Sequence, residues 1–202
     1  MTIEFILFWY NIHVKKQGKW GIEMIIIIGA GGSGKSTLQE YLISKKGFTR
    51  SLATTTRGMR KGEKNGIDYH FIIDEEFAEM NKNNQLLCVE RYNNWGYATQ
   101  KSELEKPNAV AILTPQGAKT VKDIYQDKAT IIYLDVDRRS RLISMLQTRD
   151  DIDECIRRNI ADYEMFKNAE DIADIIIKND GYQKNVSTLA NEVCSAISSR
   201  LL

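Results

Sequence analysis

Short, uninterrupted apolar runs alternate along this chain with longer segments in which apolar residues recur every three or four positions. The runs are typical of strands buried on both faces of a sheet, and they predict strands at residues 24–28, 70–73, 86–92, 109–113, 130–134 and 172–177. The helical spacing predicts helices at residues 36–45, 74–83, 140–148 and 151–167, one beginning at Thr99 or Ser102, and a last one ending near Leu201. We expect Asp74 to cap the second helix. Asp135 and Asp137 are expected to be strand-end caps, and the alternative for them is a contact with a metal ion or with a lid. Strands that alternate with helices predict an α/β fold with a parallel sheet.

The first strand leads directly into a glycine-rich turn that reads G-A-G-G-S-G-K-S. Glycines let the backbone curl so that successive N–H groups point at phosphate oxygens, and the following helix adds the positive end of its dipole. In this strand–turn–helix context the motif indicates a phosphate-binding P-loop more strongly than a structural turn. The residues expected to hold a nucleoside triphosphate are Gly29, Ala30, Gly31, Gly32, Ser33, Gly34, Lys35, Ser36 and Thr37. Lys35 would reach the β- and γ-phosphates, and Ser36 would ligate Mg²⁺.

Composition narrows the classes of function. A chain of 202 residues can bury one proper core, and 28 basic residues almost balance 27 acidic ones, so no overall field attracts nucleic acid or a membrane surface. Three widely spaced cysteines without metal-ligand spacing favour a reduced, cytoplasmic protein. The apolar stretch within residues 1–23 is too short to span a bilayer, so we interpret residues 1–23 as an N-terminal extension and 24–202 as the domain. We expect small-molecule nucleotides as partners, and a monomer or homodimer.

A second candidate anion site reads T-T-T-R-G-M-R-K-G-E-K-N-G-I-D-Y-H-F from Thr54 onward. Arg57 and Arg60 are three residues apart and can converge on one phosphate with paired N–H donors. The hydroxyls of Thr54 and Tyr69 would add hydrogen bonds. For the two arginines alone, an exposed basic loop is the alternative.

From residue 24 to about 180 the chain resembles the guanylate kinases, P-loop enzymes that phosphorylate GMP with ATP. Residues 55–71 match the family pattern T-T-R-x-x-R-x-G-E-x-x-G-x-D-Y-x-F at every fixed position. The resemblance implies a P-loop NTPase-type sheet with a small monophosphate-binding insert at residues 54–99 and a short helical lid at residues 137–160. It also implies that Arg57, Arg60 and Tyr69 grip the acceptor phosphate, that Tyr97 adds a phosphate contact and Thr99 a base contact, and that Asn179 lies near the adenine of ATP.

The lid of this family supplies arginines that stabilise the transferred phosphoryl group. By the resemblance, Arg149 is one such catalytic arginine and either Arg157 or Arg158 is another. For any one of these arginines, a solvated position on a charged helix is the alternative.

The resemblance weakens at the residues that read the base. Counting without gaps places the family's guanine-reading glutamate at Cys88, and a small register shift would let Glu90, on the same strand face, receive the guanine N1 and N2 protons. The family's two aspartates after the next central strand are absent, and Thr114 stands there as a base contact. We therefore expect an ATP- and Mg²⁺-dependent kinase of GMP or dGMP. The alternatives are a deoxynucleoside monophosphate kinase of different or broad base specificity, and a non-catalytic guanylate-kinase-like binding module.

Overall fold

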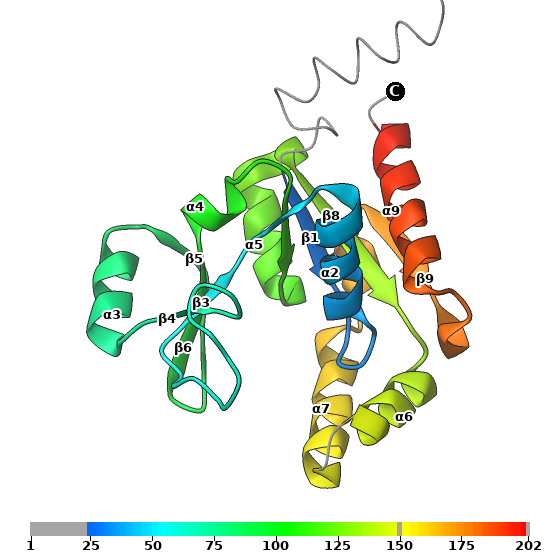
Figure 1. Ribbon diagram of the computed structural model, residues 1–202, viewed down its shortest axis with the longest axis horizontal. Coiled ribbons are helices and arrows are strands. Elements are labelled where there is room, and N and C mark those ends of the chain that lie inside the picture. Colours follow the sequence, from blue (N-terminus) through cyan, green and yellow to red (C-terminus); the bar gives the residue numbers. More distant parts are fainter. Residues whose placement is uncertain (1–23, 149–150, 201–202) are drawn as a thin grey trace, which may run out of the picture.

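The computed structural model describes residues 24–148 and 151–200 (Figure 1). The expected extension at residues 1–23 and the expected lid residue Arg149 lie outside these ranges. Within them, a parallel sheet is flanked by helices and a smaller sheet stands to one side, which confirms the predicted fold class.

Five parallel strands form the central sheet in the order β2-β7-β1-β8-β9. Their bounds are β1 Met24–Ile28, β2 Thr49–Arg50, β7 Ala109–Ile112, β8 Ala129–Asp135 and β9 Ile175–Lys178. The apolar β1 lies in the middle, paired in parallel with β7 and β8, and all five of its residues are buried. The loop after β1 therefore leaves the carboxyl edge of the sheet at its centre, where ligands bind in open α/β sheets.

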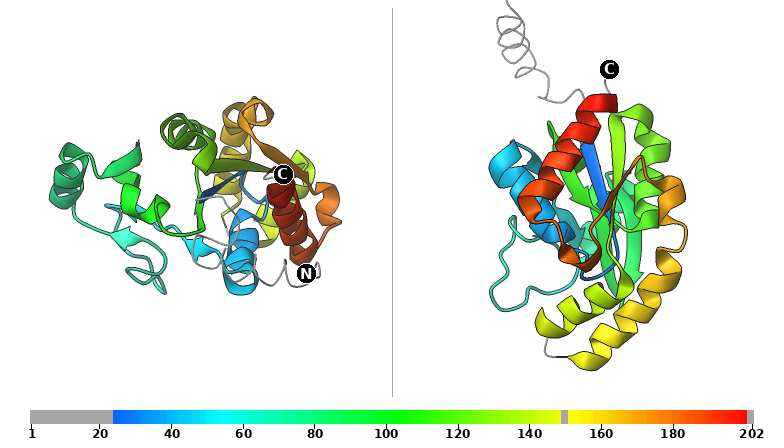
Figure 2. Two further views of the ribbon diagram at one scale, coloured as in Figure 1. Left: turned by 90° about the horizontal axis from the view of Figure 1, so that it is seen from above. Right: turned by 90° about the vertical axis from the view of Figure 1, so that its right-hand side faces the viewer.

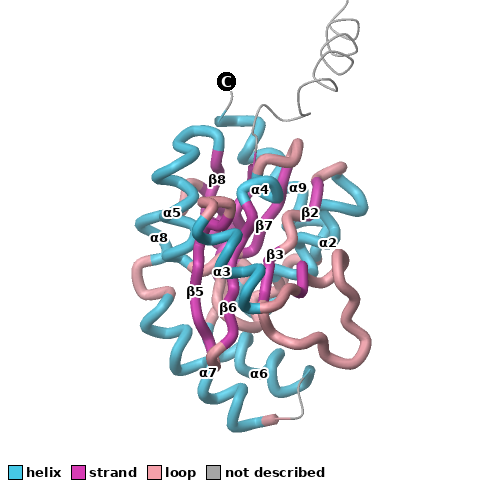
Figure 3. The backbone as a smooth tube through the Cα atoms, turned by 90° about the vertical axis from the view of Figure 1, so that its left-hand side faces the viewer, coloured by secondary structure: helices cyan, strands magenta, loops and turns pink. Residues whose placement is uncertain are grey.

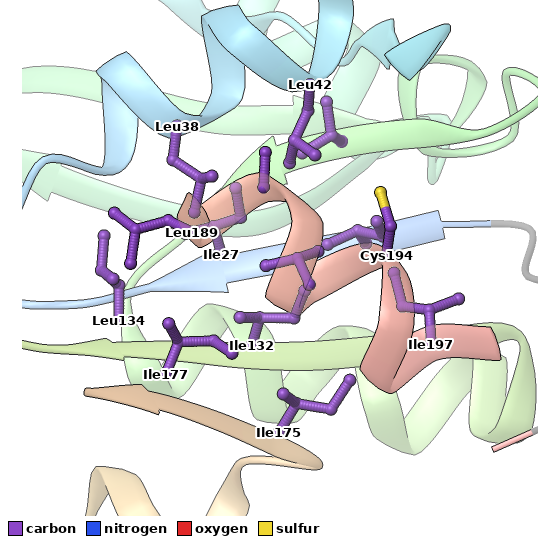
Figure 4. Packing of buried hydrophobic residues seen from close by; sticks show 14 of the residues in the cluster. Ile27, Leu38, Leu42, Ile132, Leu134, Ile175, Ile177, Leu189, Cys194 and Ile197 are labelled. Carbon is purple, nitrogen blue, oxygen red and sulfur yellow. The ribbon is translucent and has the colours of Figure 1, made fainter. Parts of the chain in front are cut away.

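Helices cover both faces of this sheet. Ile25 and Ile27 face a layer made by α2 (Lys35–Lys46) and α9 (Val186–Arg200), whose Leu38 and Leu189 pack there (Figure 4). Ile26 and Ile28 alternate to the opposite face, which is covered by α4 (Lys101–Leu104), α5 (Pro115–Tyr125) and α8 (Ala169–Ile172). Figure 2 shows the two helical layers on either side of the sheet. This two-sided burial explains why β1 is apolar throughout.

A second sheet of order β4-β3-β6-β5 stands beside the central one (Figures 1 and 3). Its strands are β3 Ala53–Thr55, β4 His70–Phe71, β5 Leu86–Tyr92 and β6 Trp95–Gln100, and it carries α3 (Asp74–Lys82). Phe77 of α3 packs on Leu86 and Ala98 and gives this sheet a small core of its own. This sheet and α3 lie within residues 53–100, close to the range in which the resemblance places an insert, and we refer to them as the insert.

Two helices, α6 (Arg138–Thr148) and α7 (Ile152–Met165), lie beyond the carboxyl end of the central sheet (Figure 1). Asp137 fixes the start of α6, because its carboxylate accepts hydrogen bonds from the N–H groups of Ser140 and Gly181, both at 2.9 Å. These bonds hold the pKa of Asp137 down at about 2. Asp137 therefore caps the start of helix α6 and not the end of strand β8, which stops at Asp135.

Two predictions about where helices begin differ from the structure. Of the two predicted starts for the helix after α3, Thr99 is wrong because residues 95–100 form strand β6, whereas Ser102 is within one residue of the observed start at Lys101. Asn93 and Asn94 have φ of 50° and 67°, the geometry of a two-residue hairpin turn that joins β5 to β6. Asp74 is the first residue of α3 and not its cap, since Ile73 holds that position without a side-chain hydrogen bond.

Two further elements depart from the predicted pattern. Helix α5 was not predicted, although Pro115 opens it and the Thr114 hydroxyl accepts a hydrogen bond from the Gly117 N–H at 3.1 Å, a helix-start signal. The strand expected over residues 172–177 begins only at Ile175, because residues 169–172 form α8.

Candidate active site

The glycine-rich loop joins β1 to α2 in the predicted strand–turn–helix arrangement. Gly32 and Gly34 have φ of 80° and 90°, a left-handed conformation in which other residues are strained. The Ser33 N–H donates to the Ala30 carbonyl at 3.2 Å and tightens the turn. No side chain of the described residues caps α2 at Gly34, so the first N–H groups of this helix are open to an anion.

Lys35 is the first residue of α2, and its Nζ donates to the Ala30 carbonyl at 2.9 Å. Burial lowers the pKa of Lys35 to about 8, while the carboxylate of Asp162 acts in the opposite direction. The Lys35 ammonium is thus held inside the loop, where nearby negative charge does not fully offset the cost of removing it from water. The neighbouring Ser36 and Thr37 are exposed in the first turn of the helix.

A cavity of about 340 Å³ opens between the insert and the central sheet, within the range typical of small-molecule sites. It is lined by Ala53, Tyr69, Cys88, Glu90, Tyr92, Tyr97, Ala98, Thr99, Ile112, Leu113 and Thr114. Five of these residues were predicted monophosphate contacts, and they come from β5, β6, the end of β7 and the loop before β4. The fold therefore collects residues that are far apart in the sequence around one space.

Glu90 reaches this cavity through an irregularity in β5. Leu87 pairs with Thr99, but the next pair is Glu90 with Tyr97, so β5 carries an extra residue between them. Cys88 lies in this bulge with φ of 53°. Cys88 and Glu90, the two positions that the sequence offered for a base-reading carboxylate, both line the cavity. The bulge places the Glu90 carboxylate where it accepts a hydrogen bond from the Thr114 hydroxyl at 2.8 Å.

The two arginines of the loop before β4, Arg57 and Arg60, have different surroundings. Arg57 is buried, and its guanidinium makes two hydrogen bonds to the Glu63 carboxylate, at 2.8 and 2.9 Å, with Tyr69 and Phe71 rings 5.6 and 5.5 Å from it. Arg60 is exposed, and its backbone N–H bonds Glu63 at 2.7 Å. Glu63 thus organises the loop. Burial raises the pKa of Tyr69.

Tyr97 depends on close packing at Gly96. A Cβ placed on Gly96 would lie 2.9 Å from the Phe77 ring, so only glycine fits between β6 and α3. The Gly96 N–H donates to the Thr56 hydroxyl at 2.9 Å, and its carbonyl accepts from the Thr55 hydroxyl at 2.9 Å. These contacts fix the strand that carries Tyr97 into the cavity.

Thr54 does not belong to this cavity. It is fully buried in β3, its hydroxyl accepts a hydrogen bond from the Gln100 amide at 3.0 Å, and it is not among the residues that line the space. Its alternation along the strand directs it to the sheet interior. Thr54 was expected to contact the phosphate directly, but its hydroxyl instead bonds Gln100 inside the insert.

A second cavity, of about 310 Å³, lies between α6 and the 3₁₀ turn η2 (Asp180–Tyr182). Asn179 precedes this turn and does not line the cavity. Its side chain instead accepts from the Lys184 N–H at 2.8 Å and donates to the Lys184 carbonyl at 3.2 Å, which closes the loop. Tyr182, on the cavity wall, donates its hydroxyl hydrogen to the Gly32 carbonyl of the glycine-rich loop.

The two predicted lid arginines within the described residues, Arg157 and Arg158, share one carboxylate. Arg157 donates to Glu154 at 2.7 and 2.9 Å, and Arg158 donates to it at 2.5 Å. These bonds lower the pKa of Glu154 to about 2. Arg157 also donates to the Tyr92 hydroxyl at 2.7 Å, which joins α7 to the insert. Of the two candidates, Arg157 is the one that contacts Tyr92, a residue that lines the cavity between the insert and the central sheet.

Sequence reasoning missed three residues that contact the glycine-rich loop or helix α7. Tyr92 contacts the lid, while Arg141 of α6 and Asp162 of α7 touch the glycine-rich loop itself. No motif marks Arg141 or Asp162, because their partner Gly31 is more than a hundred residues away along the chain. Among the described residues, no group of three or more His, Cys, Asp or Glu side chains is arranged to hold a metal ion, and no helix is long and apolar enough to cross a membrane.

Comparison with known proteins gives a consistent result. A family model described as guanylate kinase matches residues 22–196. The guanylate kinase of Mycoplasma genitalium is 30% identical over 193 residues, which cover 92% of this chain and 79% of that protein. The guanylate kinase of Malacoplasma penetrans is 33% identical over 174 residues, or 82% of this chain and 87% of that protein. A crystal structure of guanylate kinase from Anaplasma phagocytophilum aligns with a TM-score of 0.61 at 18% identity, covering 89% of this chain and 86% of that one, and supports the fold.

Proposed function

Because this chain belongs to the guanylate kinase family, it is a kinase that transfers the γ-phosphate of ATP to GMP, and we propose which of its residues perform each part of the reaction. We assign ATP to the glycine-rich loop and GMP to the cavity between the insert and the central sheet. We also assign dGMP to this cavity, because the sequence predicts a kinase of GMP or dGMP.

The triphosphate lies, in this proposal, against the open N–H groups at the start of α2. Lys35 carries the charge that meets the β- and γ-phosphates, and its desolvated ammonium is stabilised once the anion arrives. The exposed Ser36 hydroxyl is an oxygen ligand of the kind that Mg²⁺ prefers, so the loop fits this ion. When bound, Mg²⁺ would neutralise charge on the phosphates of ATP.

The cavity between α6 and η2 is the proposed adenine site. Its walls are Ser140, Ile143, Ser144, Gln147, Gly181 and Tyr182. Asn179 would act by holding the loop that bears Gly181 and Tyr182, because both polar ends of its side chain already bond Lys184. This differs from a direct contact with the base, and it makes Asn179 a positioning residue.

On the acceptor side, Arg57, Arg60, Tyr69 and Tyr97 hold the GMP phosphate in this proposal. Arg57 is preorganised by Glu63, while the exposed Arg60 closes on the phosphate when it binds. Glu90 and Thr114 lie together on the cavity wall and would receive the guanine edge, and Thr99 adds a contact at the cavity floor.

The acceptor oxygen of GMP is already anionic, so its attack on the γ-phosphorus needs no general base. The protein instead supplies alignment and positive charge. Arg157 is the lid arginine we assign to the moving phosphoryl group, with Arg158 beside it and Arg149 as a further candidate outside the described residues. Arg157 must exchange Glu154 for the phosphoryl group as the lid closes.

One observation carries this assignment: Tyr69, Glu90, Tyr97, Thr99 and Thr114 all line a single cavity. The relatives do not favour the two alternatives, a kinase of another base or a non-catalytic binding module.

An ADP-release assay with each common ribo- and deoxy-monophosphate tests the proposal, and GMP should give the highest kcat/KM. Lys35→Ala should abolish turnover, and Arg60→Ala should mainly raise the KM for GMP. Lys46→Ala on the same helix, whose ammonium bonds Asn191, is the matched control and should leave the rate unchanged. ADP release that is independent of the monophosphate, or an active Lys35→Ala variant, would contradict the assignment.

A further inference from the structure

A negatively charged side chain occupies part of the glycine-rich loop. Asp162, on helix α7, accepts a hydrogen bond from the Gly31 N–H through Oδ2 at 2.6 Å. This N–H belongs to the loop whose backbone groups we assign to the phosphates of ATP. The carboxylate therefore takes a position where an anion of the substrate would bind.

A buried arginine stands beside this contact. Arg141, on α6, is 8% exposed, and its Nη1 lies 4.0 Å from Asp162 Oδ2. Its Nε donates to the Val136 carbonyl at 2.9 Å and its Nη1 donates to the Gly31 carbonyl at 3.4 Å. Arg141 and Asp162 thus contact the two polar groups of Gly31, one on each side.

The backbone of α6 holds Arg141 against the loop. A Cβ placed on Gly32 would lie 2.7 Å from the Arg141 carbonyl oxygen, so helix and loop are in direct contact there. Both charged groups also act on Lys35, whose pKa is raised by Asp162 and lowered by Arg141. The charged side chains of Lys35, Arg141 and Asp162 therefore form one electrostatic cluster around the loop.

A phosphate that enters the loop changes which anion bonds the Gly31 N–H and which anion pairs with Arg141. The Asp162 carboxylate and a phosphate are both anions and compete for the Gly31 N–H. A buried guanidinium needs an anionic partner, because an unpaired charge in the interior is strongly unfavourable. When Asp162 withdraws, Arg141 can keep such a partner by pairing with the phosphate, and bidentate guanidinium–phosphate pairs are among the strongest hydrogen-bonded contacts.

Building on the proposed function, we infer that Arg141 is a further ATP-phosphate-binding residue, and that Asp162 is its counter-anion in the nucleotide-free enzyme. ATP displaces Asp162 from the Gly31 N–H and takes its place beside Arg141. Because Asp162 is part of α7, this exchange couples ATP binding to a shift of the lid helix.

The test is direct titration of the whole protein with ATP by calorimetry, together with the KM for GMP. Arg141→Met should weaken ATP binding by about 10- to 100-fold, the value of a charge-assisted contact, and change the KM for GMP by less than about threefold. Asp162→Asn keeps a hydrogen-bond acceptor but loses the competing charge, so it should tighten ATP binding severalfold. In the Asp162→Asn background, Arg141→Met should still weaken binding by at least about tenfold.

Arg138→Met is the matched control. Arg138 lies on the same helix and carries the same charge, but it bonds Asn159 at 2.6 Å and stacks over Tyr163. ATP affinity should stay within about twofold of the wild type. Arg141→Lys retains the charge and should lose less affinity than Arg141→Met, which provides a readout if the methionine variant unfolds.

Two results would overturn the inference. If Arg141→Met has no effect in the Asp162→Asn background, Arg141 only neutralises Asp162. If Asp162→Asn weakens ATP binding, the carboxylate holds the loop in its binding conformation and is not displaced. Wild-type protein that binds ATP but shows no GMP-dependent ADP release would refute the proposed function alone, since the titrations report on ATP.

Discussion

Glu90→Gln is the sharpest test of how the acceptor base is recognised. The Glu90 carboxylate lines the acceptor cavity and accepts one hydrogen bond from Thr114 at 2.8 Å. Its remaining acceptor positions are available to the N1–H and N2–H donors of guanine. Glutamine has nearly the same shape, but it replaces one acceptor oxygen with an NH₂ donor and removes the charge.

The expected loss has two parts. A hydrogen bond to a charged group contributes about 1.5 to 3 kcal/mol, and a donor left facing another donor costs about 1 to 3 kcal/mol more. Because Glu90 is an exposed residue, water compensates part of this loss, and we take about 3 kcal/mol. That is a decrease of about 100-fold in kcat/KM for GMP. AMP presents no N1–H donor, so its smaller kcat/KM should change little and the GMP/AMP ratio should fall by about 100-fold.

The assay is ADP release with GMP and AMP as acceptors, on variants whose urea unfolding matches the wild type. Thr114→Val is the control, because it removes the hydroxyl partner but leaves the carboxylate, and about tenfold is the largest loss expected. A GMP/AMP ratio that changes by less than about threefold in Glu90→Gln would show that this carboxylate does not read the base. An equal fall for both nucleotides would point to a general disturbance of the cavity.

Two further predictions concern the glycine-rich loop. Burial lowers the pKa of Lys35 to about 8, and a bound phosphate should raise it, so ATP affinity should be highest below pH 8 and fall as the pH increases beyond 8. Calorimetry in buffers of different ionisation enthalpy should detect the uptake of up to about 0.7 proton on ATP binding at pH 8.5. If no proton is taken up at that pH, the assignment of Lys35 to the phosphates is wrong. Gly34→Ala and Gly32→Ala both place alanine at positive φ, at a cost of about 1 to 2 kcal/mol. They differ in their surroundings: a Cβ on Gly34 meets no atom of the described residues within 4 Å, whereas a Cβ on Gly32 would lie 2.7 Å from the Arg141 carbonyl oxygen. Urea unfolding should therefore show Gly32→Ala to be less stable than Gly34→Ala by about 1 to 3 kcal/mol, and equal stabilities would mean that α6 moves away freely.

Local features of the fold could be predicted because each depends on residues that are adjacent in the sequence. The apolar run of β1, the glycines with positive φ and the lysine that opens α2 form one continuous stretch, so the loop and its neighbours were predicted correctly. Strand β6 and helix α5 were not predicted, although Asn93–Asn94 and Thr114–Pro115 carry local turn and capping signals that were passed over.

The sequence by itself determined that a nucleoside triphosphate loop and an acceptor-phosphate motif share one α/β chain, since glycine conformation and strand burial depend on short-range sterics and on hydrophobicity. Only the tertiary structure decided which side chains contact one another around the cavities and the glycine-rich loop. The bulge that brings Glu90 to Thr114, the Arg157 contact with Tyr92, and the Asp162 carboxylate on Gly31 join residues 24, 65 and 131 positions apart. Such contacts result from the packing of whole elements against one another, and no local pattern of residue types encodes them.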